Sequence, residues 1–212
     1  MTIVSLNVGL PREVDWHGRP VSTGIFKSPV SGRVPLRRLN FDGDRQADLT
    51  VHGGHAKAVY CYPAEHYEYW NAELGRDLPF GAFGENLTTT DLDERSVHLG
   101  DEFAIGTARV VVTQPRVPCY KLGIRFGDDR MVKRFLKSER SGFYVAVLQE
   151  GDVSAGDAMT PLRQHPAQVS VLEVNRLYVA KTFRRDDVAV AERALTVDAF
   201  PEEWKAYFRD RL

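Results

Sequence analysis

The chain has 212 residues, of which 43% are hydrophobic and 27% are charged, proportions that are ordinary for a folded globular protein. Lys and Arg total 28 and Asp and Glu total 29, giving a formal net charge of −1, which excludes a general electrostatic attraction to nucleic acid or anionic membranes. Any anionic ligand must therefore be held by a local cluster of cations. The length accommodates one large domain, or one domain with a small appendage.

The N-terminal segment and the cysteines indicate a cellular setting. The first nine residues are too short and too weakly charged for a signal peptide, and no apolar run is long enough to span a membrane. The two cysteines, Cys61 and Cys119, could form one disulfide at most, and nothing indicates the oxidising compartment that favours one. We therefore expect a cytoplasmic protein in which Cys119 is a reduced thiol.

The first three quarters of the chain predict mainly β-structure. Apolar, β-branched or aromatic runs recur between Gly, Pro and Asp residues. The predicted strands are residues 2–8, 58–62, 103–105, 110–113 and 143–148. Gly-Asp pairs, typical of turns, stand at residues 43–44, 100–101 and 156–157. Many short strands with such turns favour a barrel or a sandwich.

Two helices interrupt the predicted strands. The first runs from Pro63 to Leu74 and ends before Gly75, because Pro suits the first helical position and Gly suits the position after the last. The second covers residues 128–137, whose apolar side chains recur at helical spacing.

After residue 163 the composition becomes typical of α-helices. Ser170 and Glu173 form a capping box that opens a helix. The predicted helices cover residues 170–180, 186–195 and 198–211. Three short helices are marginal alone, so we expect them to pack on the β-domain or on a second subunit, as in a homodimer; they lack the basic stripe of a DNA-binding unit. The expected domains are residues 1–163 and 164–212.

The segment from Gln114 to Lys121 carries the most promising thiol. Two prolines restrict its backbone, so Cys119 lies on a preset turn. Arg116 and Lys121 are close in sequence, and nearby cations favour the thiolate, the form of cysteine that reacts and binds metals. The alternative is a strand-end turn in which Cys119 is a small buried filler.

A second dense segment covers residues 43–59. Gly53 and Gly54 let the backbone approach a ligand closely and offer consecutive N–H groups to an anion, and Lys57 follows them. The alternative is a glycine hairpin between two strands.

Two polar residues lie in other notable segments. Asn86, within residues 83–88, can form a hydrogen bond with a ligand ring or with a loop carbonyl. Lys27 ends an otherwise apolar run, and its ammonium group either meets a ligand or extends to solvent.

Zinc-binding and hydrolase motifs are absent from the sequence. The candidate ligands His52, His55, His66, Cys61 and Cys119 do not show the spacing of zinc sites. The apolar run around Cys61 favours core packing instead. The chain also contains no G-x-S-x-G, Walker A or G-x-G-x-x-G motif.

Taken together, these segments resemble the MOSC domain, named for the C-terminal domain of molybdenum cofactor sulfurases, and look most like its stand-alone YiiM-type branch. The matching residues are 23–27, 43–48, 52–54, 57–59, 62–63, 66–67, 70, 83–87, 100–101 and 114–119. The resemblance covers about residues 1–162, and the helical tail resembles the three-helix unit that follows the barrel in YiiM-type proteins. One departure is His55-Ala56, where relatives often have Pro-Asp; His55 either alters substrate choice or pH response, or is a neutral surface change.

The resemblance implies a mostly β fold, a MOSC-type β-barrel that binds the molybdenum cofactor, a pterin dithiolene carrying a phosphate. Cys119 matches the family's invariant cysteine, the expected molybdenum ligand, and a thiolate suits a soft metal site. Our own inference assigns the cations Lys27, Lys57 and Arg116 to the phosphate and the oxo-metal charge. It assigns backbone N–H groups to Gly53 and Gly54, and reading of the pterin edge to the amides of Asn86 and Gln114.

The resemblance also implies a reductase. YiiM-type relatives are associated with molybdenum-dependent reduction of N-hydroxylated compounds, including hydroxylaminopurine base analogues, to amines. His52 and Asp44 are candidates for the general acid that protonates the departing oxygen. Electrons must come from separate donor proteins, because the sequence has no flavin, haem or iron–sulfur motif.

Two alternatives remain open. The chain could be a carrier that delivers the cofactor, or sulfur on Cys119 as a persulfide, to other enzymes. It could also be a barrel whose site is vestigial.

Overall fold

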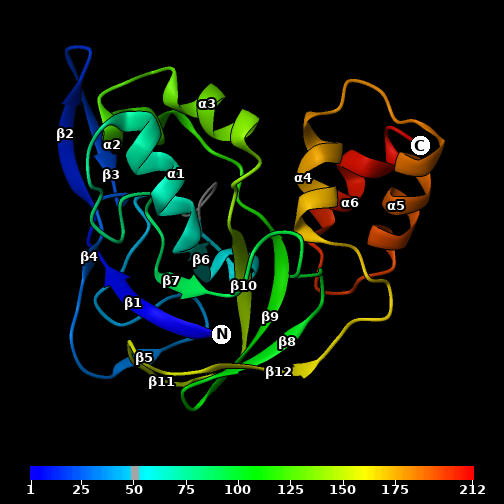
Figure 1. Cartoon of the computed structure of the whole chain (residues 1–212), viewed down its shortest axis with the longest axis horizontal. Coiled ribbons are helices and arrows are strands. Elements are labelled where there is room, and N and C mark those ends of the chain that lie inside the picture. The colour runs from blue at the N-terminus through cyan, green and yellow to red at the C-terminus, as the bar shows by residue number, and fades with distance from the viewer. Residues whose placement is uncertain (49–52) are drawn as a thin grey trace.

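The computed structural model describes residues 1–48 and 53–212 (Figure 1). An eight-stranded sheet has the order β12-β8-β9-β10-β6-β7-β1-β4, in which β6 and β7 are parallel. Its strands are β1 (Thr2–Val8), β4 (Ser28–Pro29), β6 (Val59–Pro63), β7 (Leu87–Thr90), β8 (Glu102–Ile105), β9 (Ala108–Pro115), β10 (Phe143–Gln149) and β12 (Met159–Arg163). Two smaller ladders join β2 (Arg12–Trp16) to β3 (Arg19–Thr23), and β5 (Val34–Leu36) to β11 (Gly151–Val153).

The mostly β fold class is confirmed, but no ladder closes the barrel among the described strands. The edge strands are poor partners, because β4 has 2 residues and both β4 and β12 contain a proline without an N–H group. Single contacts instead bring the N-terminal end of the chain to the start of β12 and to the turn before it. The Ile3 N–H donates to the Asp157 carbonyl at 3.0 Å, and the Met159 N–H donates to the Met1 carbonyl at 3.2 Å.

Six α-helices lie in two groups in the described part of the chain (Figure 1). The first group is α1 (Glu65–Leu74), α2 (Tyr120–Phe126) and α3 (Met131–Ser138); the second is α4 (Val171–Val179), α5 (Arg185–Leu195) and α6 (Glu202–Arg209). A 3₁₀ turn, η1 (His55–Lys57), precedes β6. Of these described helices, none has the length and apolar character needed to cross a membrane.

The sequence analysis placed most of these helices and missed one. The capping box at Ser170 is present, and α1 ends at Gly75, whose φ is 64°. The last helix begins at Glu202 rather than at residue 198, because Pro201 is its N-cap. The missed helix is α2, which begins directly after Cys119; with 7 residues it is too short to show a helical period.

Among the residues that the structure describes, the apolar core consists of three clusters, and β6 separates two of them. Val59 and Cys61 belong to the cluster inside the sheet, whereas Tyr60 and Tyr62 belong to an aromatic cluster beneath α1 and α3. This follows from the two-residue period of a strand, which alternates side chains between its faces. The third cluster lies within the C-terminal helices.

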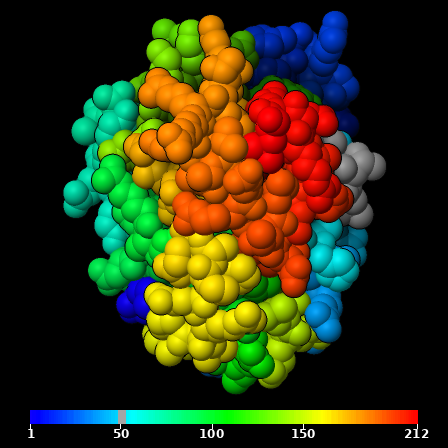
Figure 2. All heavy atoms as spheres, turned by 90° about the vertical axis from the view of Figure 1, so that its right-hand side faces the viewer, coloured from blue at the N-terminus to red at the C-terminus, as the bar shows by residue number. Residues whose placement is uncertain are grey.

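The C-terminal helical unit is fixed to the β-domain at its first helix. The Val171 N–H donates to the Val97 carbonyl at 2.9 Å, and the Leu172 N–H donates to the Glu94 carbonyl at 2.8 Å. Val117, near the end of β9, packs against the helical cluster. Figure 2 shows the orange and red atoms of this unit covering the upper part of one face. The division between domains near residue 163 stays a prediction.

Gly142 offers a test of how the turn before β10 packs against β6. Its φ is 62°, and a Cβ added to it would lie 2.5 Å from the Cys61 carbonyl oxygen. Gly75 is a matched control, with a φ of 64° and nothing within 4 Å of such a Cβ. Both Ala variants should lose roughly 1–2 kcal/mol through the left-handed backbone, and Gly142→Ala roughly 1–3 kcal/mol more through overpacking. Urea denaturation measures both losses; equal losses would contradict the close contact.

Candidate functional site

Cys119 lies at the junction between β9 and α2. It is the N-cap of α2, with a φ of −115° and a ψ of 174°, and its side chain is partly exposed. The buried cations Arg116 and Lys121 are 6% and 9% exposed and line the same cavity as Cys119, as the sequence predicted, and the charge of Cys119 acts on Arg116. The alternative of a buried filler describes Cys61 instead, which is fully buried.

A cavity of about 650 Å³, measured with its open mouth, adjoins Cys119. Its lining is strongly asymmetric in charge. Five cations line it, and none of the described lining residues is an Asp or a Glu. The cations are Lys27, Arg45, Lys57, Arg116 and Lys121. This first cavity therefore suits an anionic ligand.

Two backbone segments approach each other closely beside the first cavity. A Cβ added to Gly24 would lie 2.4 Å from the Arg45 carbonyl oxygen, which is closer than real Cβ atoms come. The absence of a side chain at Gly24 thus lets the segment after β3 pass directly against residues 45–47. Both segments line the cavity as a result.

Lys27, which lines the first cavity, forms a buried ion pair with Asp44. The Asp44 carboxylate also accepts the Gly9 N–H at 2.9 Å and the Asn86 side-chain amide at 2.9 Å. Burial lowers the pKa of Lys27, and the charge and hydrogen bond of Asp44 oppose that shift. Asp44 lines neither of the two cavities around Cys119, and its role as a general acid stays a prediction.

Asn86 lines the first cavity, but its amide is used within the protein. Its Nδ2 donates to Asp44, and its Oδ1 accepts the Tyr60 N–H at 3.1 Å. These contacts favour a positioning role, and reading of a pterin edge stays a prediction. Gly53 and Gly54 do not line the cavity, although Lys57, three residues on, does. His52 lies outside the described residues.

Two buried polar atoms near Cys119 lack hydrogen-bond partners among the described residues: Nη1 of Arg116 and Oε1 of Gln114. Such atoms are rare in folded proteins and indicate a place for a ligand or water. The Arg116 guanidinium lies over the rings of Tyr60 and Phe135, 5.3 and 4.9 Å from their centroids. Burial acts to lower the pKa of Arg116, but the charges of Tyr60, Tyr144 and Cys119 raise it overall.

A second cavity, of about 800 Å³ with its open mouth, shares four lining residues with the first: Lys57, Val117, Cys119 and Tyr144. Gln114 lines this cavity and not the first. Pro118 also lines the second cavity, and the helical unit supplies the opposite part of its lining. The wall residues from that unit are Tyr178, Glu203, Trp204 and Tyr207.

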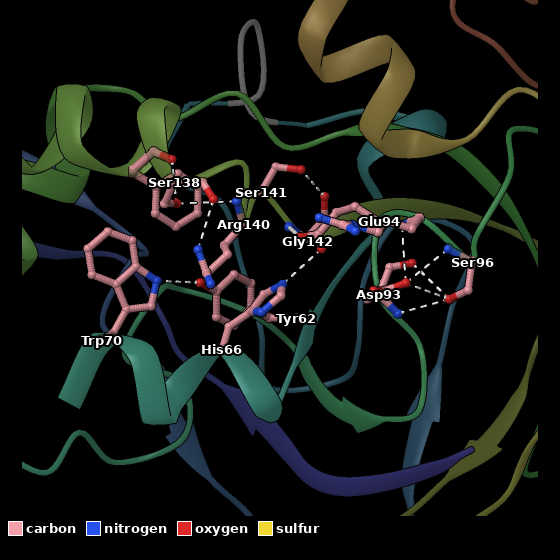
Figure 3. Close-up of polar contacts among 12 residues, drawn as sticks. Tyr62, His66, Trp70, Asp93, Glu94, Ser96, Ser138, Arg140, Ser141 and Gly142 are labelled. Atoms are coloured by element: carbon pink, nitrogen blue, oxygen red, sulfur yellow. Dashed lines mark hydrogen bonds and ion pairs between the residues drawn. The ribbon is translucent and has the colours of Figure 1, made fainter. Parts of the chain in front are cut away.

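Glu94 holds the turn at Ser141 and Gly142 (Figure 3). Its carboxylate bonds to His66 Nε2 at 2.8 Å and accepts the buried N–H of Gly142. The Gly142 carbonyl in turn accepts the Arg116 N–H at 3.4 Å. Since the Glu94 carbonyl also accepts from α4, one residue connects α1, the 141–142 turn and the helical unit.

Sequence reasoning identified Lys27, Lys57 and Arg116, which the structure brings to one cavity, and it missed Tyr60 and Tyr144. For Tyr60 a signal existed, because its alternation with Val59 and Cys61 places it on the opposite face of β6. The helical side chains of the second cavity gave no such signal, since only docking of the unit brings them to Cys119. No three His, Cys, Asp or Glu side chains gather as a metal site within the described ranges.

The two thiols should differ sharply in reactivity. Iodoacetamide should modify one thiol per native chain and two in denaturant, because Cys61 is fully buried and burial raises its pKa. Cys119→Ala should abolish native modification, and the control Cys61→Ala should leave it. Mass spectrometry counts the adducts, and native labelling of Cys61 would contradict the packing of β6.

Asp44→Asn should leave a buried ammonium without its counter-charge and cost about 3–5 kcal/mol of unfolding free energy. The pKa of Lys27 would fall further below its ordinary 10.5. Between that lowered value and 10.5 the unfolded chain binds more protons than the folded one, so stability rises with pH. The unfolding free energy of the variant, measured by denaturation from about pH 7 to about pH 10, should therefore increase with pH.

The control for this recovery is Lys27→Met combined with Asp44→Asn, which removes both buried charges. It should show no comparable rise in stability with pH. A rise of equal size in the double variant would mean that another group causes it.

Comparisons with known proteins agree with this arrangement. Residues 48–160 match the family model described as MOSC domain, and residues 169–212 match the YiiM-like, 3-alpha helix domain. The chain is 43% identical over 216 residues to the uncharacterized protein YflK of Bacillus subtilis (strain 168), covering 100% of this chain and 96% of YflK. It is 34% identical to protein YiiM of Escherichia coli (strain K12), covering 92% of this chain and 86% of that protein.

Two further matches extend the comparison. A protein named Reductase from Gibberella moniliformis (strain M3125 / FGSC 7600) is 32% identical over 86% of this chain, which spans 33% of that longer protein. The crystal structure of YiiM from Geobacillus stearothermophilus superposes with a TM-score of 0.82 at 34% identity, covering 100% of this chain and 98% of the other. This chain therefore belongs to the MOSC domain family and carries the YiiM-like three-helix unit at its C-terminal end.

Proposed function

We propose that this protein binds the molybdenum cofactor at Cys119 and reduces N-hydroxylated compounds to amines. The observation that carries the proposal is the first cavity, where five cations and no described carboxylate surround a partly exposed cysteine. The MOSC family is associated in general with this cofactor. One relative of the chain is named a reductase.

The described residues fit the cofactor in two respects. A thiolate at Cys119 is the soft ligand that a molybdenum dithiolene site accepts, and the cations match the charge of a phosphate. The unpartnered Nη1 of Arg116 is a buried donor beside the same cavity. Arg45 and Lys57 provide further positive charge for an anionic group there.

When bound, the cofactor supplies a metal that exchanges two electrons with the substrate. Conversion of an N–OH group to N–H consumes two electrons and two protons and releases water. In our proposal Cys119 holds the metal, while Lys57, Arg45 and Arg116 hold the anionic part of the cofactor. His52 and Asp44 remain candidates for proton delivery, and separate donor proteins in the cytoplasm supply the electrons.

The decisive measurement is molybdenum and pterin content after anaerobic purification from a host that makes the cofactor. Wild type and the control Cys61→Ala should retain near-stoichiometric molybdenum, whereas Cys119→Ala should lose most of it with its fold intact by circular dichroism. The loaded protein should then reduce an N-hydroxylated purine with a chemical electron donor.

Molybdenum retained by Cys119→Ala would overturn the assigned ligand. Loaded wild type that reduces no N-hydroxylated compound, but transfers its cofactor to an apo-enzyme, would replace the reductase by a carrier.

A further inference from the structure

The β2–β3 hairpin stands apart from the main sheet. Its two strands pair with each other and with no other described strand, and Figure 1 shows the hairpin projecting from one end of the molecule. A lone two-stranded hairpin is only marginally stable, so it needs support from its surroundings. The His17 ring bonds to the Asp129 carboxylate at 3.0 Å, which holds the tip of the hairpin to the turn after α2.

One face of the hairpin lies against the start of α2. The strand pairing sets Trp16 opposite Arg19, and both side chains line a third cavity, of about 720 Å³ with its open mouth. Tyr120 lines this third cavity as well and is 54% exposed. Tyr120 is the first residue of α2 and directly follows Cys119. The hairpin face therefore reaches the residue next to the proposed metal ligand.

Three more guanidinium groups lie near the junction of the hairpin with α2. Those of Arg12 and Arg125 lie over the same ring, that of Phe26, at 3.7 and 5.2 Å from its centroid. The guanidinium of Arg76 lies 5.7 Å from the centroid of Phe126, the last residue of α2. Stacking on a ring uses the flat face of a guanidinium, so its N–H groups stay available for a planar anion such as a carboxylate.

The four arginines on this side have no acidic partner. Within the described part of the chain, no ion pair is formed by Arg12, Arg19, Arg76 or Arg125. Exposed arginines elsewhere do form them, as Arg176 does with Glu139 at 2.7 Å. The hairpin acids, residues 13 and 15, alternate with Trp16 along β2 and so lie on its other face. We call the four arginines, with Trp16 and Tyr120, the arginine face.

The arginines also repel one another. Burial is the largest cause that lowers the pKa of Arg125, the charge of Glu85 opposes it, and the charges of Arg12 and Arg76 add to it. Nε of Arg125 is buried and has no hydrogen-bond partner among the described residues. The charge of this cluster is therefore not satisfied within the chain, and carboxylates from a second molecule would offset the repulsion.

We propose that the arginine face is the surface on which an acidic electron-carrier protein docks. Arg, Trp and Tyr are the residues that protein interfaces favour, and complexes between electron carriers bury small areas. Opposite charge on the carrier speeds the encounter, and docking beside Tyr120 brings the carrier close to Cys119.

This inference rests on the proposed function for its reaction, which needs an external source of electrons. The carrier is oxidised and gives two electrons in total, in one encounter or in two. Solvent supplies two protons, the N–O bond breaks, and the oxygen leaves as water.

Binding is measured first, by calorimetry, with no substrate present. The probes are oxidised ferredoxin and oxidised flavodoxin, two acidic carriers that hold an iron–sulfur cluster and a flavin, and the control is cytochrome c, a basic carrier. At least one acidic carrier should bind, and cytochrome c should not. The Kd should rise steeply between about 0.01 M and about 1 M salt, because the Debye length falls from about 30 Å to about 3 Å.

Charge reversal locates the surface. Arg19→Glu combined with Arg76→Glu should weaken binding of the carrier about 10- to 100-fold, because two attractive contacts become repulsive. Both residues are exposed and neither lines the first or the second cavity. The matched control combines Lys181→Glu with Arg185→Glu, two exposed cations at the start of the α5 segment, on the opposite side of the molecule (Figure 1). It should leave binding unchanged.

Turnover then compares two electron sources, with molybdenum-loaded protein and an N-hydroxylated purine. With the carrier that binds, the Arg19→Glu and Arg76→Glu double variant should lose kcat/KM for the carrier by the same about 10- to 100-fold. With reduced methyl viologen, a small chemical donor, its rate should equal that of wild type. Equal loss with both donors in the folded variant would mean damage to the site and would overturn the proposal.

The binding experiment keeps this inference separate from the proposed reaction. Carrier binding that is lost in the double variant upholds the surface even where loaded wild type reduces nothing, in which case only the proposed reaction fails. The surface is overturned where neither acidic carrier binds wild type at low salt, or where the double variant binds as well as wild type. Binding of phosphatidylglycerol vesicles, but of neither carrier, would assign the arginine face to a membrane surface instead.

Discussion

The buried ion pair between Lys27 and Asp44 is the interaction on which the rest of the site depends. Removing two charges from water is costly, and their attraction repays that cost only when the remaining hydrogen-bonding capacity is also satisfied. Here the carboxylate accepts from Gly9 and Asn86 as well. The pair therefore fixes four segments that are far apart in the sequence.

That arrangement explains how a chain with almost no net charge can concentrate cations. Asp44 pairs with one lysine of the first cavity without lining it, and the described lining of that cavity contains no carboxylate. On the far side of Cys119, Glu203 compensates Lys57. Individual cations of the site are thus paired with individual carboxylates, and the net charge of the whole chain does not indicate the charge of the site.

The sequence predicted those helices and strands whose formation depends on residues that are close together in the chain. Strands such as β1 and β10 are apolar runs with clear ends, and α4 carries its capping box within four residues. The β2–β3 hairpin escaped notice because its exposed strands have a polar composition. Closure of the barrel could not be judged either, since it depends on pairing between the two edges of the sheet.

The same distinction holds for the site. Cys119, Lys27 and Arg116 stand in short motifs, so the sequence could point to them, and the structure places them around one cavity. Gln114 belongs to the other cavity, a difference of side-chain direction that no motif carries. The aromatic wall of α6 lies more than eighty residues from Cys119 along the chain, and only tertiary docking joins them.

The division of the two cavities between the domains also has a consequence for the order of synthesis. Every lining residue of the first cavity precedes residue 145, whereas the second cavity needs α4 and α6. Because domains tend to fold as units during synthesis from the N-terminus, a nascent chain can complete the lining of the first cavity before α6 exists. Until the helical unit docks, Cys119 and Lys57 lack the wall that α6 later provides, and Lys57 lacks its partner Glu203.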